Sequence, residues 1–415
     1  MSEIQPQKSR IRAHFPALAE VAYLNTGSAG PLSVGAAGAI ASRAERELRH
    51  GRADLGLQHA EDQPRLAELR QRFARLLGAD EDEIALTPNT THGMNVAVWG
   101  VSWRPGDEVI TTSGEHVGAL LPIYAAVRRF GLSLRMVTIG DNPSAFAERV
   151  AGVLTTRTRL VVLSHVCYGD GSVLPIAAVA RAASRVGALV AVDGAQSAGA
   201  LQVDVHALGV DLYSVPGQKW LCGPEGVGAL YVRRDRLPEV SQTFVGFASV
   251  REAQGFDETG YFIPSAGARR FEVGTVYAPT IHGMAESLRY LEEEVGYRSA
   301  FEATQAITRR CREALSAVPG VSLLSPPAHA GLTAFSVAGI EPAEVVRRLS
   351  ERRVVIRSIP YPGHLRASTG FFNDESDVDR LVEGLVDVQK DLSATVGQST
   401  ASQSATVGAS GVERK

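Results

Sequence analysis

Between residues 83 and 192, short apolar runs alternate with amphipathic segments, and this alternation constrains the fold more than any other feature of the chain. The apolar runs have the length of strands and lie at 83–87, 108–111, 132–139, 159–164 and 188–192. The segments between them, such as 117–130 and 176–186, have the apolar spacing of helices. Near-continuous apolar strands that alternate with helices predict an α/β fold, in which helices cover both faces of a mostly parallel sheet.

Polar loops follow several of these predicted strands. In open parallel sheets, ligands bind beyond the carboxyl ends of the strands. The loops place these polar or aromatic residues at one edge: His116, His165, Tyr168, Asp193 and Gln196. A lone histidine is more often structural than catalytic, but three such loops at the same edge indicate a binding site.

Two other segments have compositions that suit ligand contacts. A loop of glycine, serine and proline at 23–32 lets the backbone approach a ligand closely, and it contains the candidates Asn25 and Ser28. The segment 88–95 comes before an apolar helix, and free N–H groups at a helix start bind anions such as phosphate. A simple turn and an ordinary helix cap are the alternative interpretations of these two segments.

The stretch 214–232 places Lys219 between a strand-like run and a glycine-rich turn, about one strand after Asp193. An aspartate followed at this distance by a lysine among small residues is typical of pyridoxal 5′-phosphate (PLP) chemistry. The lysine amine forms a Schiff base with the cofactor aldehyde, and the carboxylate pairs with the protonated pyridine nitrogen. This spacing also arises by chance, so the interpretation depends on the neighbouring motifs.

Composition indicates an ordinary soluble protein. The chain has 415 residues, enough for two domains, and a formal net charge of −3, so no basic excess points to nucleic acid or to a membrane surface. We see neither a secretory signal in the polar residues 1–12 nor an apolar run that spans a bilayer, and we expect a cytoplasmic protein. The scattered Cys167, Cys222 and Cys311 suit neither a disulfide framework nor a metal site.

We expect four parts along the chain. These are an N-terminal arm at 1–20, a large cofactor-binding domain at 21–285, a smaller α+β domain at 286–392 and a disordered tail at 393–415. The tail is rich in serine, alanine, threonine and glycine, which is typical of disorder.

Together these motifs resemble the class V aminotransferase family of fold-type I PLP enzymes, from about residue 23 to about residue 392. The sequence Gly-Gln-Lys-Trp-Leu-Cys-Gly-Pro at 217–224 is most similar to the branch of isopenicillin N epimerase-like enzymes and cysteine or cystine C–S lyases. The resemblance implies PLP as cofactor, a sheet of the seven-stranded type in the large domain, and a homodimer with shared active sites.

The resemblance also implies a role for each candidate residue. Lys219 matches the Schiff-base lysine, Asp193 the partner of the pyridine nitrogen, and Gln196 the neighbour of the cofactor's phenolic oxygen. His116 matches the aromatic ring that stacks on the pyridine, and the phosphate site corresponds to Thr91, His92 and Gln218. Thr275 matches a residue that reaches the phosphate of the neighbouring subunit. Arg366 matches the arginine that clamps the substrate's α-carboxylate in bidentate geometry, with Asn25 and Ser28 as further substrate-binding candidates.

The chain departs from the family pattern in an informative way. Cysteine desulfurases carry a nucleophilic cysteine on a loop just before the carboxylate-binding arginine, whereas 358–365 contains no cysteine. The family's histidine before the lysine is Gln218 here, a phosphate-binding serine or threonine is Pro216, and an asparagine is Tyr168. These differences favour the lyase or epimerase branch.

These parts predict a PLP-dependent C–S β-lyase that converts a cysteine S-conjugate into a thiol, pyruvate and ammonia. Lys219 would act as the base at Cα, and His116 or Tyr168 would protonate the departing sulfur. An epimerase, an aminotransferase or a decarboxylating oxidative deaminase uses the same residues, so these alternatives stay open. A non-catalytic binding protein with the PLP fold is a further alternative, but the lysine, aspartate, stacking ring and carboxylate clamp are all present together.

Overall fold

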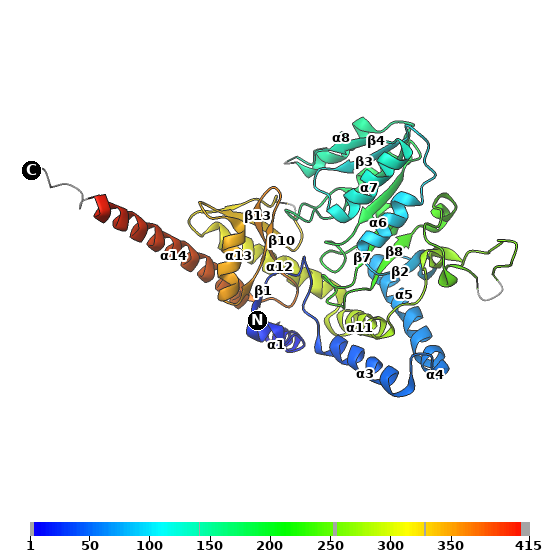
Figure 1. Ribbon diagram of the computed structural model, residues 1–415, viewed down its shortest axis with the longest axis horizontal. Helices are drawn as coiled ribbons and strands as arrows, with labels where there is room; N and C mark the ends of the chain where they lie inside the picture. The colour runs from blue at the N-terminus through cyan, green and yellow to red at the C-terminus, as the bar shows by residue number, and fades with distance from the viewer. Residues whose placement is uncertain (1–3, 141, 252–254, 328, 408–415) are drawn as a thin grey trace, which may run out of the picture.

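The computed structural model describes residues 4–140, 142–251, 255–327 and 329–407. A large body, built around one sheet, packs against a smaller body formed by the C-terminal part of the chain (Figure 1). None of the described helices is long and apolar enough to cross a membrane.

The large body contains a seven-stranded sheet with the order β2-β8-β7-β6-β5-β3-β4. In that order the strands are Ile84–Thr87, Gly228–Val232, Leu212–Pro216, Leu189–Asp193, Thr158–Ser164, Glu108–Thr112 and Ser133–Val137. Strand β8 is antiparallel to both of its neighbours, and the other neighbouring pairs are parallel. All residues of β6, β7 and β8 are buried, because helices cover both faces. The predicted α/β fold is therefore confirmed.

Two apolar layers lie on opposite faces of the sheet. One layer contains Met94 and Ile123 from α6 (Thr90–Trp99) and α7 (Val117–Phe130). The other contains residues of α5 (Gln63–Leu77), α8 (Pro143–Val153), α9 (Ile176–Ser184) and α11 (Ala278–Arg289). Helix α3 (Val34–His50) packs along α11. The short helices α4 (Leu55–Leu57) and α10 (Val205–Leu208) complete the large body.

The smaller body has a four-stranded antiparallel sheet with the order β12-β13-β10-β9. Its strands are Arg357–Ile359, His364–Ser368, Leu332–Val337 and Val321–Leu323, and its helices are α12 (Tyr297–Ser316), α13 (Pro342–Glu351) and α14 (Glu375–Val407). A separate parallel pair joins β1 (Ala22–Tyr23) to β11 (Val354–Val355). Ala22 and Leu24 lie in the core of the smaller body, and the predicted start of the large domain at residue 21 stays a prediction.

The N-terminal segment packs against the protein more closely than its polar composition predicts. It forms α1 (Ile4–Ala13) and α2 (Ala17–Glu20), and Phe15 and Leu18 are buried in the core of the large body. The Arg12 guanidinium lies 2.6 Å from the Asp377 carboxylate at the start of α14. These few apolar and charged anchors are enough to fix the predicted arm.

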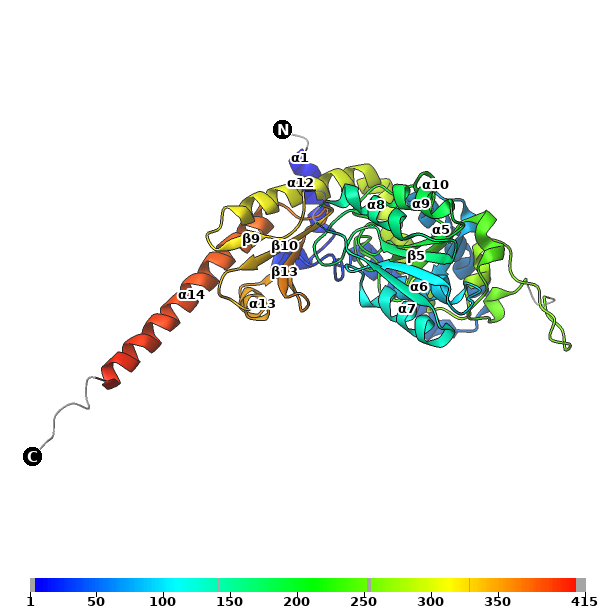
Figure 2. The same ribbon diagram turned by 90° about the horizontal axis from the view of Figure 1, so that it is seen from above.

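The last helix is longer than predicted. Helix α14 continues to Val407 and extends away from both bodies (Figure 1, Figure 2). The prediction of a disordered tail from residue 393 therefore differs from the structure over 393–407. This segment contains no proline and several alanines, so nothing in it forces the helix to end. Residues 408–415 lie outside the described part of the chain.

Candidate active site

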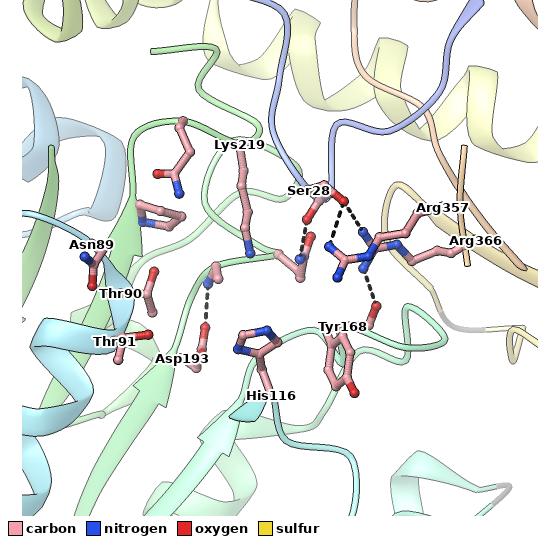
Figure 3. Close-up of a pocket in the computed structure, with 15 residues that line it drawn as sticks. Ser28, Asn89, Thr90, Thr91, His116, Tyr168, Asp193, Lys219, Arg357 and Arg366 are labelled. Carbon is pink, nitrogen blue, oxygen red and sulfur yellow. Dashed lines mark hydrogen bonds between the residues drawn. The ribbon is translucent and has the colours of Figure 1, made fainter. Parts of the chain in front are cut away.

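A pocket of about 220 Å³ lies at the carboxyl-end edge of the large sheet, where the smaller body faces it. Most of the predicted site residues line this pocket: Ser28, Thr91, His116, Tyr168, Asp193, Gln196, Gln218, Lys219 and Arg366. In Figure 3, Lys219 points into the space between the turn at Thr90 and Thr91 on one side and two arginines on the other. The sheet edge that the sequence indicated thus carries the candidate site.

Lys219 and Asp193 form the electrostatic centre of the pocket. Lys219 follows the end of β7, and burial lowers the pKa of its amine to about 8, against the opposing effect of Asp193. Asp193 is the last residue of β6 and is 5% exposed. Its carboxyl group accepts a hydrogen bond of 2.8 Å from the Ala195 N–H. Burial raises the pKa of Asp193, and the nearby Lys219 opposes this shift. A lysine amine with a lowered pKa is a better nucleophile near neutral pH, as Schiff-base formation requires.

The loop at 23–32 lies against the lysine segment. The Gly30 N–H donates a hydrogen bond of 2.7 Å to the Gln218 carbonyl oxygen. A Cβ added at Gly30 would collide with the Lys219 carbonyl oxygen, so only glycine allows this close approach. This contact explains the glycine at position 30.

His116 and Tyr168 form one wall of the pocket. Their rings meet edge to face, with centroids 5.1 Å apart. His116 caps α7, since its Nδ1 accepts a 3.0 Å hydrogen bond from the Gly118 N–H, which assigns the ring proton to Nε2. Burial, assisted by Lys219, lowers the pKa of His116, so its imidazole is neutral at pH 7. A neutral ring suits stacking on a cofactor and leaves an Nε2 proton available.

Gln196 is held on two sides. Its Nε2 donates to the Gly27 carbonyl oxygen at 2.8 Å, and its Oε1 accepts from the Trp220 indole N–H at 3.0 Å. The side chain is 3% exposed, and it lines the pocket beside Lys219. Its predicted position next to the cofactor's phenolic oxygen stays a prediction.

The start of α6 has the features of a phosphate site. Asn89, Thr90 and Thr91 line the pocket at this point. Within the described residues, the buried Thr90 Oγ1 and Gln218 Oε1 have no hydrogen-bond partner. The Asn89 side chain also caps the helix by accepting a 2.9 Å hydrogen bond from the His92 N–H. The helix start can therefore be capped by Asn89 and still bind an anion.

His92 is one candidate that the structure does not bring into the pocket. Its ring lies 6.0 Å from the Phe244 ring, centroid to centroid, and its N–H is already used by Asn89. Successive residues of a helix point about 100° apart, so Thr91 faces the pocket while His92 turns away. His92 is absent from the pocket lining, and its predicted place in the phosphate-binding turn stays a prediction.

Asn25 and Thr275 also lie outside the pocket lining. Asn25 acts on it indirectly, because its Oδ1 accepts a 2.7 Å hydrogen bond from the Ser28 hydroxyl. Thr275 is exposed on a segment next to the exposed Val276 and Tyr277. Its predicted reach to the phosphate of a neighbouring subunit stays a prediction.

Two arginines face each other at the far side of the pocket. Arg366 on β13 lies directly opposite Arg357 on β12 in the antiparallel register. Arg366 donates to the Tyr168 carbonyl oxygen at 2.7 Å, and both guanidinium groups reach the Ser28 hydroxyl oxygen at 3.1 Å. No described carboxylate forms an ion pair with either arginine. Arg366 is 1% exposed, and burial together with the charge of Arg357 lowers its pKa to about 9.

Sequence reasoning found Arg366 but missed Arg357. The signal was present in the spacing, because two arginines nine residues apart can lie opposite each other in a hairpin. The sequence did not show where the hairpin turns, and the register therefore could not be assigned.

These residues fit PLP. The pocket brings together a desolvated lysine, a buried carboxylate, a neutral aromatic ring and a helix start with an unpartnered threonine hydroxyl. They would hold the aldehyde, the pyridine nitrogen, the ring face and the phosphate respectively.

The comparison with known families agrees with this donor set. Residues 55–381 match the Aminotransferase class-V family. The chain belongs to this family. A solved structure of C-DES with glycine linked to the PLP cofactor matches this chain with a TM-score of 0.85 and 32% identity. PLP is therefore the cofactor of this protein, as the resemblance implied. That match covers 91% of this chain and 99% of the other.

Other relatives point to sulfur chemistry. A complex of the cystine C–S lyase C-DES with its product cysteine persulfide has a TM-score of 0.84 and 32% identity, and covers 90% of this chain and 99% of the other. A cysteine desulfurase of Klebsiella pneumoniae is 30% identical over 92% of this chain and 98% of its own length. The expected class, a PLP-dependent carbon–sulfur lyase, is therefore confirmed at the level of the family. The more specific resemblance to the isopenicillin N epimerase-like branch stays a prediction.

Proposed function

We propose that this protein is a C–S β-lyase whose substrate is a cysteine S-conjugate with a second carboxylate on the departing sulfur side. Cystine is one compound of this class. The observation that supports the proposal is the pair Arg357 and Arg366, which have no described carboxylate partner and face the pocket together.

The arrangement of the two arginines favours a dianionic substrate. Like charges directly opposite each other in a sheet destabilise it, and burial of an unpaired guanidinium adds to this cost. The only group that now bridges Arg357 and Arg366 is the neutral Ser28 hydroxyl, as far as the described residues show. Two carboxylates would supply the missing negative charge. Arg366, which is deeper, would bind the α-carboxylate, and the exposed Arg357 would bind the second one.

The chain's own residues account for the proton transfers. Bound PLP supplies the electron sink for negative charge at Cα, and Asp193 stabilises the protonated pyridine nitrogen. The Lys219 amine removes the Cα proton, which its lowered pKa favours. The Cβ–S bond then breaks with its electron pair on sulfur, and His116 or Tyr168 donates a proton to the departing group. Hydrolysis of the remaining fragment gives pyruvate and ammonia.

Cysteine desulfuration is the second candidate, because several relatives carry that name. That reaction, as resemblance implies, needs a nucleophilic cysteine before the carboxylate-binding arginine. The β12–β13 hairpin has none, and the free Cys167, Cys222 and Cys311 are all buried. Burial raises the pKa of each of these thiols, so the reactive thiolate is disfavoured. We therefore favour elimination that needs no cysteine of the enzyme.

We also propose that the active protein is a homodimer in the cytoplasm. Exposed apolar side chains gather on the segments around Thr275: Phe244, Val245, Phe247, Val273, Val276 and Tyr277. A monomer rarely exposes so many large apolar side chains on neighbouring segments without an interaction partner. A second copy that covers them would bring its Thr275 towards the first copy's phosphate site.

The test is product identification by mass spectrometry. We expect the PLP-loaded protein to convert cystine into pyruvate, ammonia and cysteine persulfide, and to act more slowly on S-methylcysteine. A keto acid with the sulfur retained would identify an aminotransferase instead. An aldehyde with carbon dioxide would identify an oxidative deaminase, and a stereoinverted amino acid would identify an epimerase.

Replacement of Arg357 by alanine tests the second carboxylate. We expect KM for cystine to rise about fivefold, since an exposed charge–charge contact contributes about 1 kcal/mol, and KM for S-methylcysteine to stay unchanged. Steady-state kinetics on both substrates measure the difference. Arg347→Ala on the exposed face of α13 is the matched control, because it removes one charge outside the pocket. Equal changes for both substrates would exclude Arg357 from recognition of the second carboxylate.

A further inference from the structure

Glu115, directly before the pocket residue His116 in the chain, carries a buried carboxyl group. Glu115 is 3% exposed. Its Oε1 accepts from the Thr112 hydroxyl at 2.6 Å and from the Ser164 N–H at 2.9 Å, and its Oε2 accepts from the Ser164 hydroxyl at 2.6 Å. The side chain therefore ties the carboxyl end of β3 to that of β5.

These contacts connect Glu115 to two residues of the candidate site. Ser164 is the register partner of Asp193 in the β5–β6 pair, so Glu115 holds the strand end that lies beside Asp193. His116, the next residue, starts α7 and forms the wall of the pocket. Glu115 itself does not line the pocket. Any effect on the reaction must pass through Asp193 or His116.

The ionisable groups around Glu115 are acids. The ionisable groups that act on it are the Asp193 carboxyl from β6 and the Cys167 thiol after β5, and neither provides a positive charge. No described residue forms an ion pair with Glu115. Burial, together with Asp193, raises the pKa of Glu115 to about 7, while the Ser164 and Thr112 hydrogen bonds oppose this rise. The carboxyl group therefore changes charge near neutral pH.

We propose that Glu115 is a positioning residue, which fixes the loop of His116 and, when ionised, stabilises positive charge at the cofactor's pyridine nitrogen through its proximity to Asp193. This inference rests on the use of the pocket by PLP in the proposed function. It does not depend on which substrate is cleaved. Ionisation of Glu115 adds a second negative charge close to Asp193, so a protonated pyridine nitrogen paired with Asp193 would be held more tightly.

The test compares PLP affinity at two pH values. Glu115→Gln keeps the shape and, after rotation of the Ser164 hydroxyl, every hydrogen bond, but it cannot ionise. We expect the PLP dissociation constant of E115Q to equal that of the wild type at pH 6. At pH 8 we expect it to be about fivefold larger, because only the wild type has gained the charge. The proposal would be overturned if the ratio of the two PLP dissociation constants, E115Q over wild type, were the same at pH 6 and pH 8.

The unliganded protein gives a second readout. A carboxyl whose pKa is raised on folding contributes less stability as pH rises from about 4.5 towards about 7, because the folded state then holds a proton that the unfolded state has lost. We expect the melting temperature of the wild type to fall relative to that of E115Q between pH 5 and pH 7, and the difference to level off above pH 7. Parallel curves for the two proteins would contradict the assigned titration.

Two further variants separate position from charge. Glu108→Gln removes a buried charge at the other end of β3, where Glu108 pairs with Arg135, and should change stability without any pH-dependent change in PLP affinity. Ser164→Ala removes a donor to the ionised carboxylate and should move the affinity transition to higher pH. A transition that stays at its wild-type pH in S164A would show that another group titrates.

Discussion

Replacement of Lys219 by alanine is expected to lower kcat by about 10³-fold or more, because it removes both the covalent anchor of PLP and the base at Cα. The same change should abolish the visible absorption band that a lysine-linked cofactor gives. The only other lysines in the sequence are Lys8, Lys390 and Lys415. Neither Lys8 nor Lys390 lines the pocket, so neither can replace Lys219 as the anchor of the cofactor. Absorption spectra and turnover of the purified variant measure both effects.

The matched control is Lys390→Ala, which removes an exposed amine on α14 and should leave the spectrum and turnover unchanged. Added small amines give a second check. If the K219A protein is folded, an external amine should restore part of the Cα proton transfer, because the cavity left by the side chain can admit it. A K219A protein that keeps the wild-type absorption band would disprove the lysine assignment.

The fold was predictable from sequence where local signals were strong. The helix predicted at 117–130 has the same bounds in the structure, because His116 caps its start and Gly131 adopts φ of 65° at its end. The buried strands β5 and β6 also appear where continuous apolar runs stand between helical segments. Residues next to these elements determine where they begin and end, so their bounds can be predicted without knowledge of long-range contacts.

Long-range pairing explains what the sequence did not reveal. The two-residue strand β1 pairs with β11, more than 300 positions later, and such a short strand has no periodicity of its own. The segment 354–359 is divided between two short strands, β11 and β12. The antiparallel pairing of β12 with β13 places Arg357 opposite Arg366.

Some of the site residues could likewise be placed from local sequence signals, and others could not. Lys219, Asp193 and His116 follow predicted strands closely, so their meeting at one edge followed from the parallel topology. The orientation of His92 depends on where α6 begins, and a shift of one residue turns a side chain by about 100°. Glu115 was visible only as the neighbour of His116, because nothing in the sequence shows that Thr112 and Ser164 enclose it.

Arg366→Ala is expected to lower kcat/KM for amino-acid substrates by about 10² to 10³-fold, mainly through KM, and to leave PLP affinity within about twofold of the wild type. The loss is large because the guanidinium is 1% exposed, so removal of a buried charge partner costs several kcal/mol. Arg366→Lys should recover only part of the activity, since an ammonium cannot bind a carboxylate in bidentate geometry. Steady-state kinetics and PLP titration of both variants measure these effects. If R366A instead lost PLP affinity and kept KM, Arg366 would belong to cofactor binding, and the α-carboxylate would have to bind at Arg357.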